Sequence, residues 1–257
     1  MSTSRQIVTE LRIAERERKA IEPFSDTIPD LDIATAYAAQ ARFVQGKIDD
    51  GDPVVGAKLG LTSRAKQLAM GVSDPLYGRV TRSMLAPHGE PVDLGTLIQP
   101  RVEPEIAFLL GRELAGSATI TEVLTATEAV FAALDILDSR YRDYRFTLPD
   151  VVADNCSAGR FLLGSTALSP TAVADLRLTG CVLRADGEVV ATAAGAAVMG
   201  HPAASVAWLV RRLAERGETL PAGSLVFSGG LTAPLPLCAG HCITAEFDGL
   251  GTVEAFA

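Results

Sequence analysis

The amino-acid sequence predicts an α+β fold built around a mixed, rolled β-sheet. Two helical patterns stand at the N-terminus, and most later apolar segments have strand character and are joined by short turns. The strongest turn signal is Asp186-Gly187, which separates Cys181–Ala185 from Glu188–Thr192 as a hairpin. Strands that arrive in hairpins, with interspersed helices, favour this architecture over regular βαβ alternation. Glycine-rich phosphate-binding motifs are also missing, which disfavours nucleotide-binding folds.

The first helix is expected from a capping box at Thr3-x-x-Gln6 to about Ala20, and the second from Ile33 to Asp49. Gly51 stands where a helix C-terminus favours glycine. We expect residues 1–55 to form a helical segment that packs on a core made by residues 56–257, the two together forming one structural unit.

Beyond the second helix, apolar periodicity and turn residues predict the remaining elements in order. The expected helices span Thr62–Met70, Thr121–Phe131 and a segment from Pro202 that Gly217 ends. The expected strands are Val54–Gly60, Glu103–Leu110, Ala132–Leu137, the hairpin around Asp186-Gly187, Leu225–Ser228, Cys242–Phe247 and Thr252–Phe256.

Composition excludes several classes of function. The 257 residues carry a net charge of −8, so no basic stripe is available to bind nucleic acid. Two long stretches without charged residues are interrupted by glycine and proline, which indicates buried strands and turns, not membrane spans. The four cysteines form no C-x-x-C pair and the chain has three histidines, so we expect reduced thiols, no zinc site and a cytoplasmic protein.

The most informative local pattern is Glu103-Pro104-Glu105 within an apolar strand. Side chains alternate along a strand, so Glu103 and Glu105 leave from one face. Two like charges on one face of a buried strand repel each other, and a hard divalent cation with oxygen ligands would relieve this. The pattern alone leaves a second interpretation open: a solvent-facing pair on an edge strand, which Pro104 would also suit.

Six ordered segments together resemble the fumarylacetoacetate hydrolase superfamily, in its branch of 2-hydroxypentadienoate hydratases and 4-oxalocrotonate decarboxylases. The match begins near Gly56 and runs to the C-terminus in the same order. The segments are Gly56–Ser63, Glu103–Phe108, Asp135–Arg140, Val151–Asn155, Gly200–Pro202 and Gly249–Gly251. The resemblance implies a fumarylacetoacetase C-terminal-domain-like β-roll with N-terminal helices, in which residues 56–257 form the metal-binding catalytic domain.

The resemblance also implies a magnesium or manganese site with ligands Glu103, Glu105 and Asp135. Many relatives carry glutamate at the third position, so the shorter Asp135 would bind either directly or through water. Lys58 matches an active-site lysine of the family, where it would hold a substrate carboxylate or transfer a proton.

The resemblance also implies further substrate-binding positions. They are Asn155, Ser157, Ser228, Gly229 and Thr232. For Asn155 and Ser157 a loop-capping role is an equal alternative, and for Gly229 a tight turn is the alternative.

The choice between the two reactions depends on Leu76. Hydratases of the branch have an acidic residue where this chain has Leu76, and the decarboxylases look apolar there. We therefore predict decarboxylation of 2-oxohex-3-enedioate (4-oxalocrotonate) to 2-hydroxypenta-2,4-dienoate, within meta-cleavage of aromatic compounds, with Arg140 or Lys58 holding the departing carboxylate. The alternatives are a 2-hydroxypenta-2,4-dienoate hydratase and a non-catalytic partner subunit of one. We also expect a homo-oligomer, and the family implies a possible complex with a paralogous hydratase.

Overall fold

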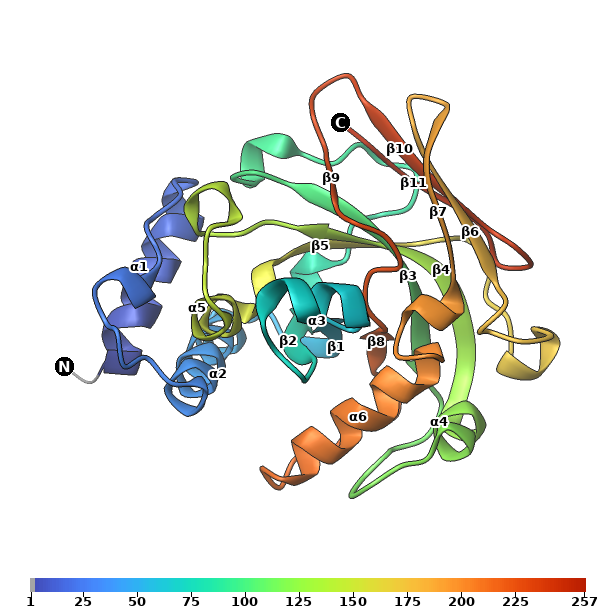
Figure 1. Ribbon diagram of the computed structural model, residues 1–257, viewed down its shortest axis with the longest axis horizontal. Helices are drawn as coiled ribbons and strands as arrows, with labels where there is room; N and C mark the ends of the chain where they lie inside the picture. The colour runs from blue at the N-terminus through green and yellow to red at the C-terminus, as the bar shows by residue number, and fades with distance from the viewer. Residues whose placement is uncertain (1–2) are drawn as a thin grey trace.

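The computed structural model describes residues 3–257, and its helices and strands form two sheets with helices at one end and along one side (Figure 1). The helices are α1 (Thr3–Glu17), α2 (Ile33–Asp49), α3 (Arg64–Met70), α4 (Ile120–Ala126), α5 (Leu148–Ala153) and α6 (Pro202–Ala214). The strands are β1 (Val54–Gly60), β2 (Leu76–Thr81), β3 (Arg101–Leu110), β4 (Thr127–Leu137), β5 (Ala158–Leu163), β6 (Gly180–Ala185), β7 (Glu188–Ala194), β8 (Leu225–Phe227), β9 (Leu235–Pro236), β10 (Cys242–Phe247) and β11 (Gly251–Phe256).

The larger sheet has the order β2-β1-β8-β3-β4-β5, with β9 also paired to β3. Its pairs are antiparallel except β1 with β8, so the sheet is mixed. The smaller sheet has the order β11-β10-β6-β7 and packs against β4 and β5. Figure 1 shows the long strands β3 and β4 curving strongly, which rolls the larger sheet around the middle of the molecule. The predicted α+β class with a mixed, rolled sheet is confirmed.

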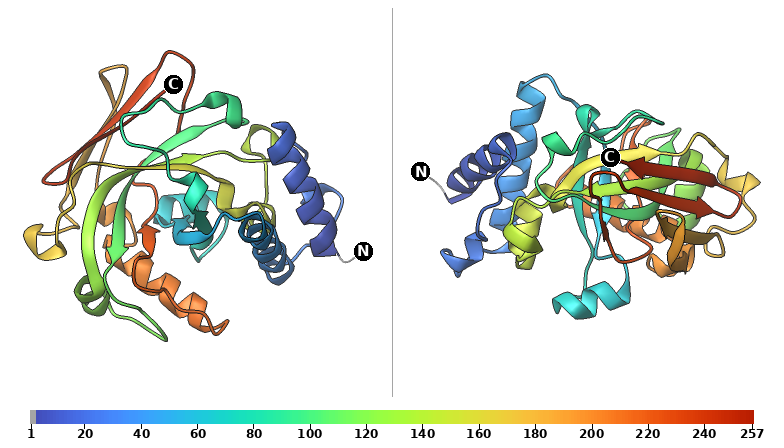
Figure 2. Two further views of the ribbon diagram at one scale, coloured as in Figure 1. Left: turned by 180° about the vertical axis from the view of Figure 1, so that it is seen from behind. Right: turned by 90° about the horizontal axis from the view of Figure 1, so that it is seen from above.

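The N-terminal helices pack on each other, and α2 also packs on α5, at the end of the molecule away from the smaller sheet (Figures 1 and 2). Asp32 caps α2 by accepting from the Thr35 amide, and Gly51 follows its end at φ +88°. The predicted bounds of α2 are therefore confirmed, whereas α1 ends at Glu17, before the expected Ala20.

One predicted element is wrong. Residues expected to form a helix through Phe131 divide into a short helix ending at Ala126 and a strand that begins at Thr127. The β-branched and aromatic residues of this stretch suit a strand, and pairing with β3 along its whole length supplies hydrogen bonds that a helix would forgo. β4 is long and curved for this reason.

Hydrophobic side chains fill both sides of the larger sheet. Most of the core lies between this sheet, the helices and the smaller sheet. A separate cluster lies on the face that also bears Lys58, Glu105 and Asp135; it comprises Val80, Met84, Ala107, Ala133, Ala158, Phe161, Leu225 and Phe227. That face is the concave side of the curved strands, so the charged groups on it lie next to these apolar side chains.

Within residues 3–257, no helix combines the length and the apolar character that a membrane span needs.

Candidate metal centre

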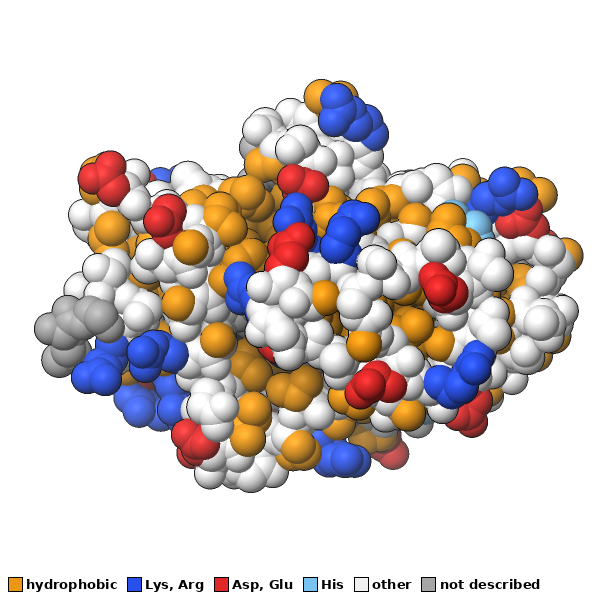
Figure 3. Space-filling model, turned by 90° about the horizontal axis from the view of Figure 1, so that it is seen from below, with side chains coloured by type: hydrophobic (Ala, Val, Ile, Leu, Met, Phe, Trp, Pro, Cys, Tyr) orange, Lys and Arg blue, Asp and Glu red, His pale blue; other side chains and the backbone are white. Residues whose placement is uncertain are grey.

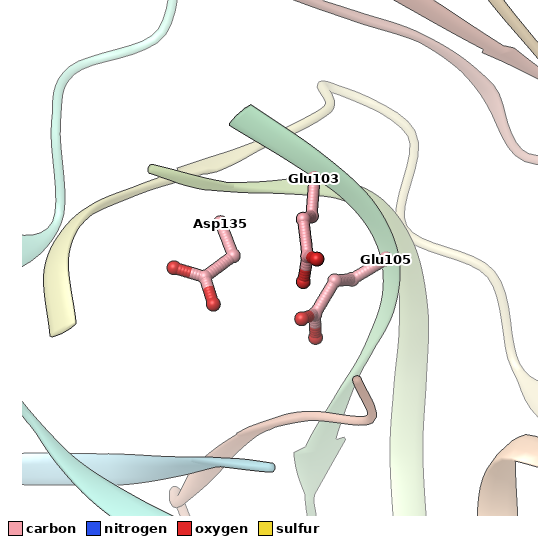
Figure 4. Close-up of side chains that lie close together, drawn as sticks. All are labelled: Glu103, Glu105 and Asp135. Atoms are coloured by element: carbon pink, nitrogen blue, oxygen red, sulfur yellow. The ribbon is translucent and has the colours of Figure 1, made fainter. Parts of the chain in front are cut away.

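Three buried carboxylates converge on the concave face of the larger sheet. Glu103 and Glu105 project from β3, and Asp135 lies directly opposite Glu103 on β4 in the antiparallel register (Figure 4). Each offers an oxygen within 4.8 Å of the others, and their exposed fractions are only 7%, 0% and 0%. The alternation of side chains along β3 therefore places Glu103 and Glu105 on one face, as the sequence pattern predicted.

The edge-strand interpretation of Glu103 and Glu105 is excluded. β3 lies inside the sheet, with β4 on one side and β8 and β9 on the other. Pro104 falls in the gap between the residues paired to β9 and those paired to β8, where a missing N–H breaks no ladder. The segment that fills this gap carries Gly229 and Gly230 across the carboxylates.

Two lysines neutralise part of this charge. Lys58 of β1 is 2% exposed, and its Nζ lies 2.7 Å from Asp135 Oδ2 and donates to the Cys156 carbonyl at 3.1 Å. Lys66 of α3 also reaches the cluster, with Nζ 2.6 Å from Glu103 Oε1. Two ammonium groups face three carboxylates, so one negative charge is left for a cation to balance.

Burial and mutual repulsion alter the acidity of these groups. Burial, followed by the charge of Asp135, raises the pKa of Glu105 well above its ordinary value. Burial raises the pKa of Asp135 to about 6, although Lys58 opposes the change. Burial alone would lower the pKa of Lys58, but Asp135 and Glu105 raise it above its ordinary value. A divalent cation would return both carboxyls to their ionised form.

The unsatisfied oxygens of the cluster fit a metal ion. Among residues 3–257, Glu105 Oε1 and Asp135 Oδ1 have no hydrogen-bond partner, although buried oxygens are normally paired. A methyl group on Gly230 would lie 2.2 Å from Glu103 Oε2, so the glycine keeps the space before that carboxylate open. Three carboxylates offer the oxygen donors that Mg²⁺ and Mn²⁺ prefer and leave positions for substrate and water.

The loop of residues 228–232 lies against the carboxylate cluster. The Gly229 amide donates to Glu105 Oε2 at 2.7 Å, and Gly229 has φ +112°, a conformation that favours glycine. Ser228 Oγ is buried and has no hydrogen-bond partner among the described residues, so it is available to a ligand. Thr232 instead donates its hydroxyl to the Ala233 carbonyl. The predicted roles of these three residues in substrate binding stay predictions, with Ser228 the best placed.

Arg140 lies in a different environment from the one its predicted role requires. It is 1% exposed, forms a buried ion pair with Asp154, and donates to the carbonyls of Asp138, Asp154 and Ala158. These contacts support a structural role because the guanidinium is already occupied by protein acceptors. The prediction that Arg140 holds a departing carboxylate finds no support in them.

Asn155 and Ser157 also make protein contacts. The Asn155 amide bonds to the backbone of Arg79, and Ser157 Oγ donates to Asp154. Their alternative role as loop anchors is the one that agrees with these hydrogen bonds.

Leu76 lies on the same face of the larger sheet as Lys58, and its role in the choice of reaction stays a prediction. It pairs with Gly60 on β1, two residues beyond the Lys58–Gly78 pair, so Leu76 and Lys58 share the concave face. A methyl group on Gly60 would lie 2.7 Å from Leu76 Cδ1, so the leucine covers the glycine. Leu76, 3% exposed, also borders a cavity of about 900 Å³ between α2, α3 and α6. Figure 3, which views the molecule from below, shows hydrophobic side chains interspersed with charged ones over this face.

The family model described as fumarylacetoacetate (FAA) hydrolase C-terminal matches residues 54–256. The chain belongs to this family. A 4-oxalocrotonate decarboxylase from Pseudomonas sp. (strain CF600) is 44% identical over 243 residues, covering 94% of this chain and 92% of the relative. A 2-keto-4-pentenoate hydratase from Paraburkholderia xenovorans (strain LB400) is 41% identical over 242 residues, covering 94% of this chain and 90% of the relative.

A solved structure extends the similarity to the whole fold. The 4-oxalocrotonate decarboxylase from Pseudomonas putida G7, complexed with magnesium and adipate, superimposes with a TM-score of 0.95 at 39% identity. The match covers 100% of this chain and 98% of that one. The predicted fold and the predicted magnesium or manganese cofactor thus agree with the acidic cluster and with a metal-containing relative.

The sequence patterns did not identify Lys66 and Gly230 as site residues. Lys66 lies 37 residues before Glu103, and only the folded position of α3 brings the two together. Lys66 follows Gly56–Ser63, a segment that carried the family resemblance, and Gly230 adjoins the predicted substrate-binding residue Gly229, so proximity to these residues was the available signal.

Proposed function

We propose that this protein catalyses the Mg²⁺- or Mn²⁺-dependent decarboxylation of 2-oxohex-3-enedioate to 2-hydroxypenta-2,4-dienoate and CO₂, in the meta-cleavage catabolism of aromatic compounds. The carrying observation is the combination of a carboxylate cluster with unpartnered oxygens and an apolar Leu76 on the face of Lys58. The adipate in the similar decarboxylase supports a six-carbon dicarboxylate as substrate.

Glu103, Glu105 and Asp135 would hold the cation from one side. Bound there, the cation would act as a Lewis acid that polarises the 2-oxo group of the substrate. Lys58 supplies a buried ammonium beside the cluster that can hold an anionic oxygen of the substrate or transfer a proton. Ser228 Oγ offers a further hydrogen-bonding group that is not committed to the protein.

The reaction breaks the bond between C5 and C6 of the substrate. The electron pair of that bond forms a double bond between C4 and C5, the C3–C4 double bond moves to C2–C3, and the 2-oxo oxygen receives the charge. Protonation of that oxygen gives 2-hydroxypenta-2,4-dienoate, and C6 leaves as CO₂. Leu76 and the apolar floor of Phe161 and Phe227, whose ring centroids lie 4.5 Å apart, would keep water from the electron-rich chain.

Hydration of 2-hydroxypenta-2,4-dienoate is the second candidate, because hydratases are 41% identical over 94% of this chain. A hydratase needs a group that positions and deprotonates water, and Leu76 cannot do so. A non-catalytic partner subunit is less favoured, because a scaffold has no use for buried carboxylates with unsatisfied oxygens. Association with a paralogous hydratase is compatible with either catalytic role.

One assay separates these candidates. Purified protein with Mg²⁺ would be offered 2-oxohex-3-enedioate and 2-hydroxypenta-2,4-dienoate separately, while ultraviolet absorbance and CO₂ release are followed. The proposal expects CO₂ from the first compound and no consumption of the second. Consumption of the second without CO₂ from the first would establish the hydratase, and loss of neither would favour the partner subunit.

A further inference from the structure

Three consecutive residues beside the metal centre adopt left-handed backbone conformations. Asn155, Cys156 and Ser157 have φ values of 50°, 56° and 55°. None is glycine, and L-residues pay an energetic cost in this region, although asparagine tolerates it better than most. Such a run persists only where neighbouring contacts determine it, and strained backbone of this kind gathers at functional sites.

The Asn155 side chain supplies the contacts that determine the turn. Its Oδ1 accepts from the Arg79 amide at 2.8 Å, and its Nδ2 donates to the Arg79 carbonyl at 2.9 Å. Arg79 belongs to β2, which is the edge strand of the larger sheet. The amide of Asn155 therefore binds β2 in the manner of a neighbouring strand, and both of its polar atoms are used.

Gly78 makes this close approach possible. A methyl group at Gly78 would lie 2.5 Å from the Asn155 carbonyl oxygen, a distance that forces a shift of the backbone. Gly78 pairs with Lys58 across β1 and β2, so the turn rests directly above the lysine.

One carbonyl group of this turn contacts the Lys58 ammonium. Cys156 directs its carbonyl at Lys58 Nζ at 3.1 Å, and Asp135 Oδ2 is the other polar partner of that group within the described residues. Asp135 itself would be engaged by the cation. The Cys156 carbonyl is then the contact that fixes where the ammonium points.

We propose that Asn155 is a positioning residue for Lys58: its amide clamps β2 and so holds the left-handed turn whose Cys156 carbonyl orients the ammonium toward substrate. This inference rests on the proposed function for the part that Lys58 plays in turnover. It replaces the expectation that Asn155 binds substrate, because both polar atoms of its amide are bonded to Arg79.

Asn155→Gly tests the clamp without adding backbone strain, because glycine adopts the left-handed conformation freely. We expect kcat to fall by ~10- to 100-fold, because a small displacement of a reacting group is costly, with KM and Mg²⁺ affinity changed by less than about threefold. Asp186→Gly is the matched control. Asp186 also has positive φ and binds backbone through its side chain, at the Cys242 amide, but it lies in the β6–β7 hairpin, so kcat should not change.

A double-mutant cycle distinguishes positioning from general loosening of the fold. In a Lys58→Ala background, Asn155→Gly should lower kcat by less than about twofold more, since the residue it positions is gone. A further loss of tenfold or more in that background would overturn the inference. If Asn155→Gly fails to fold, Gly78→Ala displaces the same turn from the other side and takes its place in the cycle.

A spectroscopic readout is independent of turnover. The chain has four lysines, so the ¹⁵N resonance of the Lys58 Nζ can be assigned by its loss in Lys58→Ala. Asn155→Gly should shift or broaden that resonance, and Asp186→Gly should leave it in place. An unchanged resonance in Asn155→Gly would contradict the inference even if the decarboxylase is confirmed, and a shifted one would support the clamp even if neither substrate turns over.

Discussion

The carboxylate cluster and the Arg140–Asp154 ion pair are both buried, and they differ in how their hydrogen bonds are satisfied. The first is the carboxylate cluster of Glu103, Glu105 and Asp135. The second is the ion pair of Arg140 with Asp154, whose side chains are 1% and 0% exposed. By burial and charge alone the two clusters would be ranked alike as candidate sites.

The hydrogen bonds separate them. Around Arg140, the guanidinium donates to Asp154 and to backbone carbonyls on neighbouring segments, as a structural ion pair must. In the carboxylate cluster, one oxygen each of Glu105 and Asp135 has no partner within residues 3–257, and Gly230 keeps the space before Glu103 open. Unsatisfied acceptors, more than buried charge, therefore distinguish the candidate site.

The largest expected effect is on the Arg140 pair. Arg140→Ala leaves Asp154 buried without its partner, so we expect a loss of about 3–5 kcal/mol in the free energy of unfolding. Denaturant unfolding measures this. Arg184→Ala is the control, since its partner Glu246 is half exposed and surface pairs contribute no more than about 1 kcal/mol. An equally small effect of both substitutions would remove the structural role assigned to Arg140.

The second expected effect is a loss of turnover without a loss of stability. Glu105→Gln keeps the shape of the side chain but removes one ligand charge, so turnover with Mg²⁺ should fall by at least ~100-fold, since even groups that only support a ligand contribute 10- to 100-fold. Stability in the presence of a chelator should not fall, because a repelling buried charge is gone. Glu128→Gln, on the exposed side of β4, is the control. If Glu105→Gln destabilised the protein and left turnover normal, the carboxylate cluster would have a structural role like that of the Arg140–Asp154 pair.

A smaller effect is expected at Leu76. Leu76→Asp places a carboxylate on the face of Lys58, close to the three carboxylates and the anionic substrate. Decarboxylation should fall by about tenfold, which corresponds to roughly 1.4 kcal/mol of lost transition-state stabilisation. Leu76→Asn adds a polar side chain of similar size without a charge. Comparing it with Leu76→Asp therefore separates the effect of charge repulsion from that of polarity. If wild-type protein hydrates the dienol and releases no CO₂, the role given to Leu76 is wrong.

The smallest expected effect is on pH dependence. The pKa of Asp135 is about 6 in the folded protein against 3.8 for the ordinary group, and that of Glu105 is also raised. Between these values the folded state binds more protons than the unfolded state, so metal-free protein should lose stability as pH rises from about 4 to 6. Mg²⁺ competes with those protons and should raise the melting temperature more at pH 7.5 than at pH 5. Thermal unfolding with and without Mg²⁺ checks this, and an equal gain at both values would argue against these ligands.

Local patterns predicted those parts of the site that depend on one strand. Alternation alone placed Glu103 and Glu105 on one face, and glycine and capping signals gave the bounds of α2 and the β6–β7 hairpin. Asp135 and Lys58 required the family resemblance, because nothing local relates separate strands to β3.

The parts that escaped prediction depend on contacts between distant segments. The wrong helix through Phe131 was corrected by pairing with β3, and the Arg140–Asp154 pair forms only when the turn after α5 meets the end of β4. Lys66 and the Asn155 clamp likewise act on residues far along the chain. Sequence patterns identify residue types suited to a site, but they do not show whose hydrogen bonds are already satisfied.

The central claim is that the unsatisfied carboxylate cluster, and not the Arg140 pair, is the metal centre. Calorimetric titration of the metal-free protein with Mg²⁺ tests it most directly. We expect one binding event per chain, lost in both Glu103→Gln and Glu105→Gln, weakened in Asp135→Ala and retained in Glu128→Gln. Undiminished Mg²⁺ affinity in Glu105→Gln would contradict it.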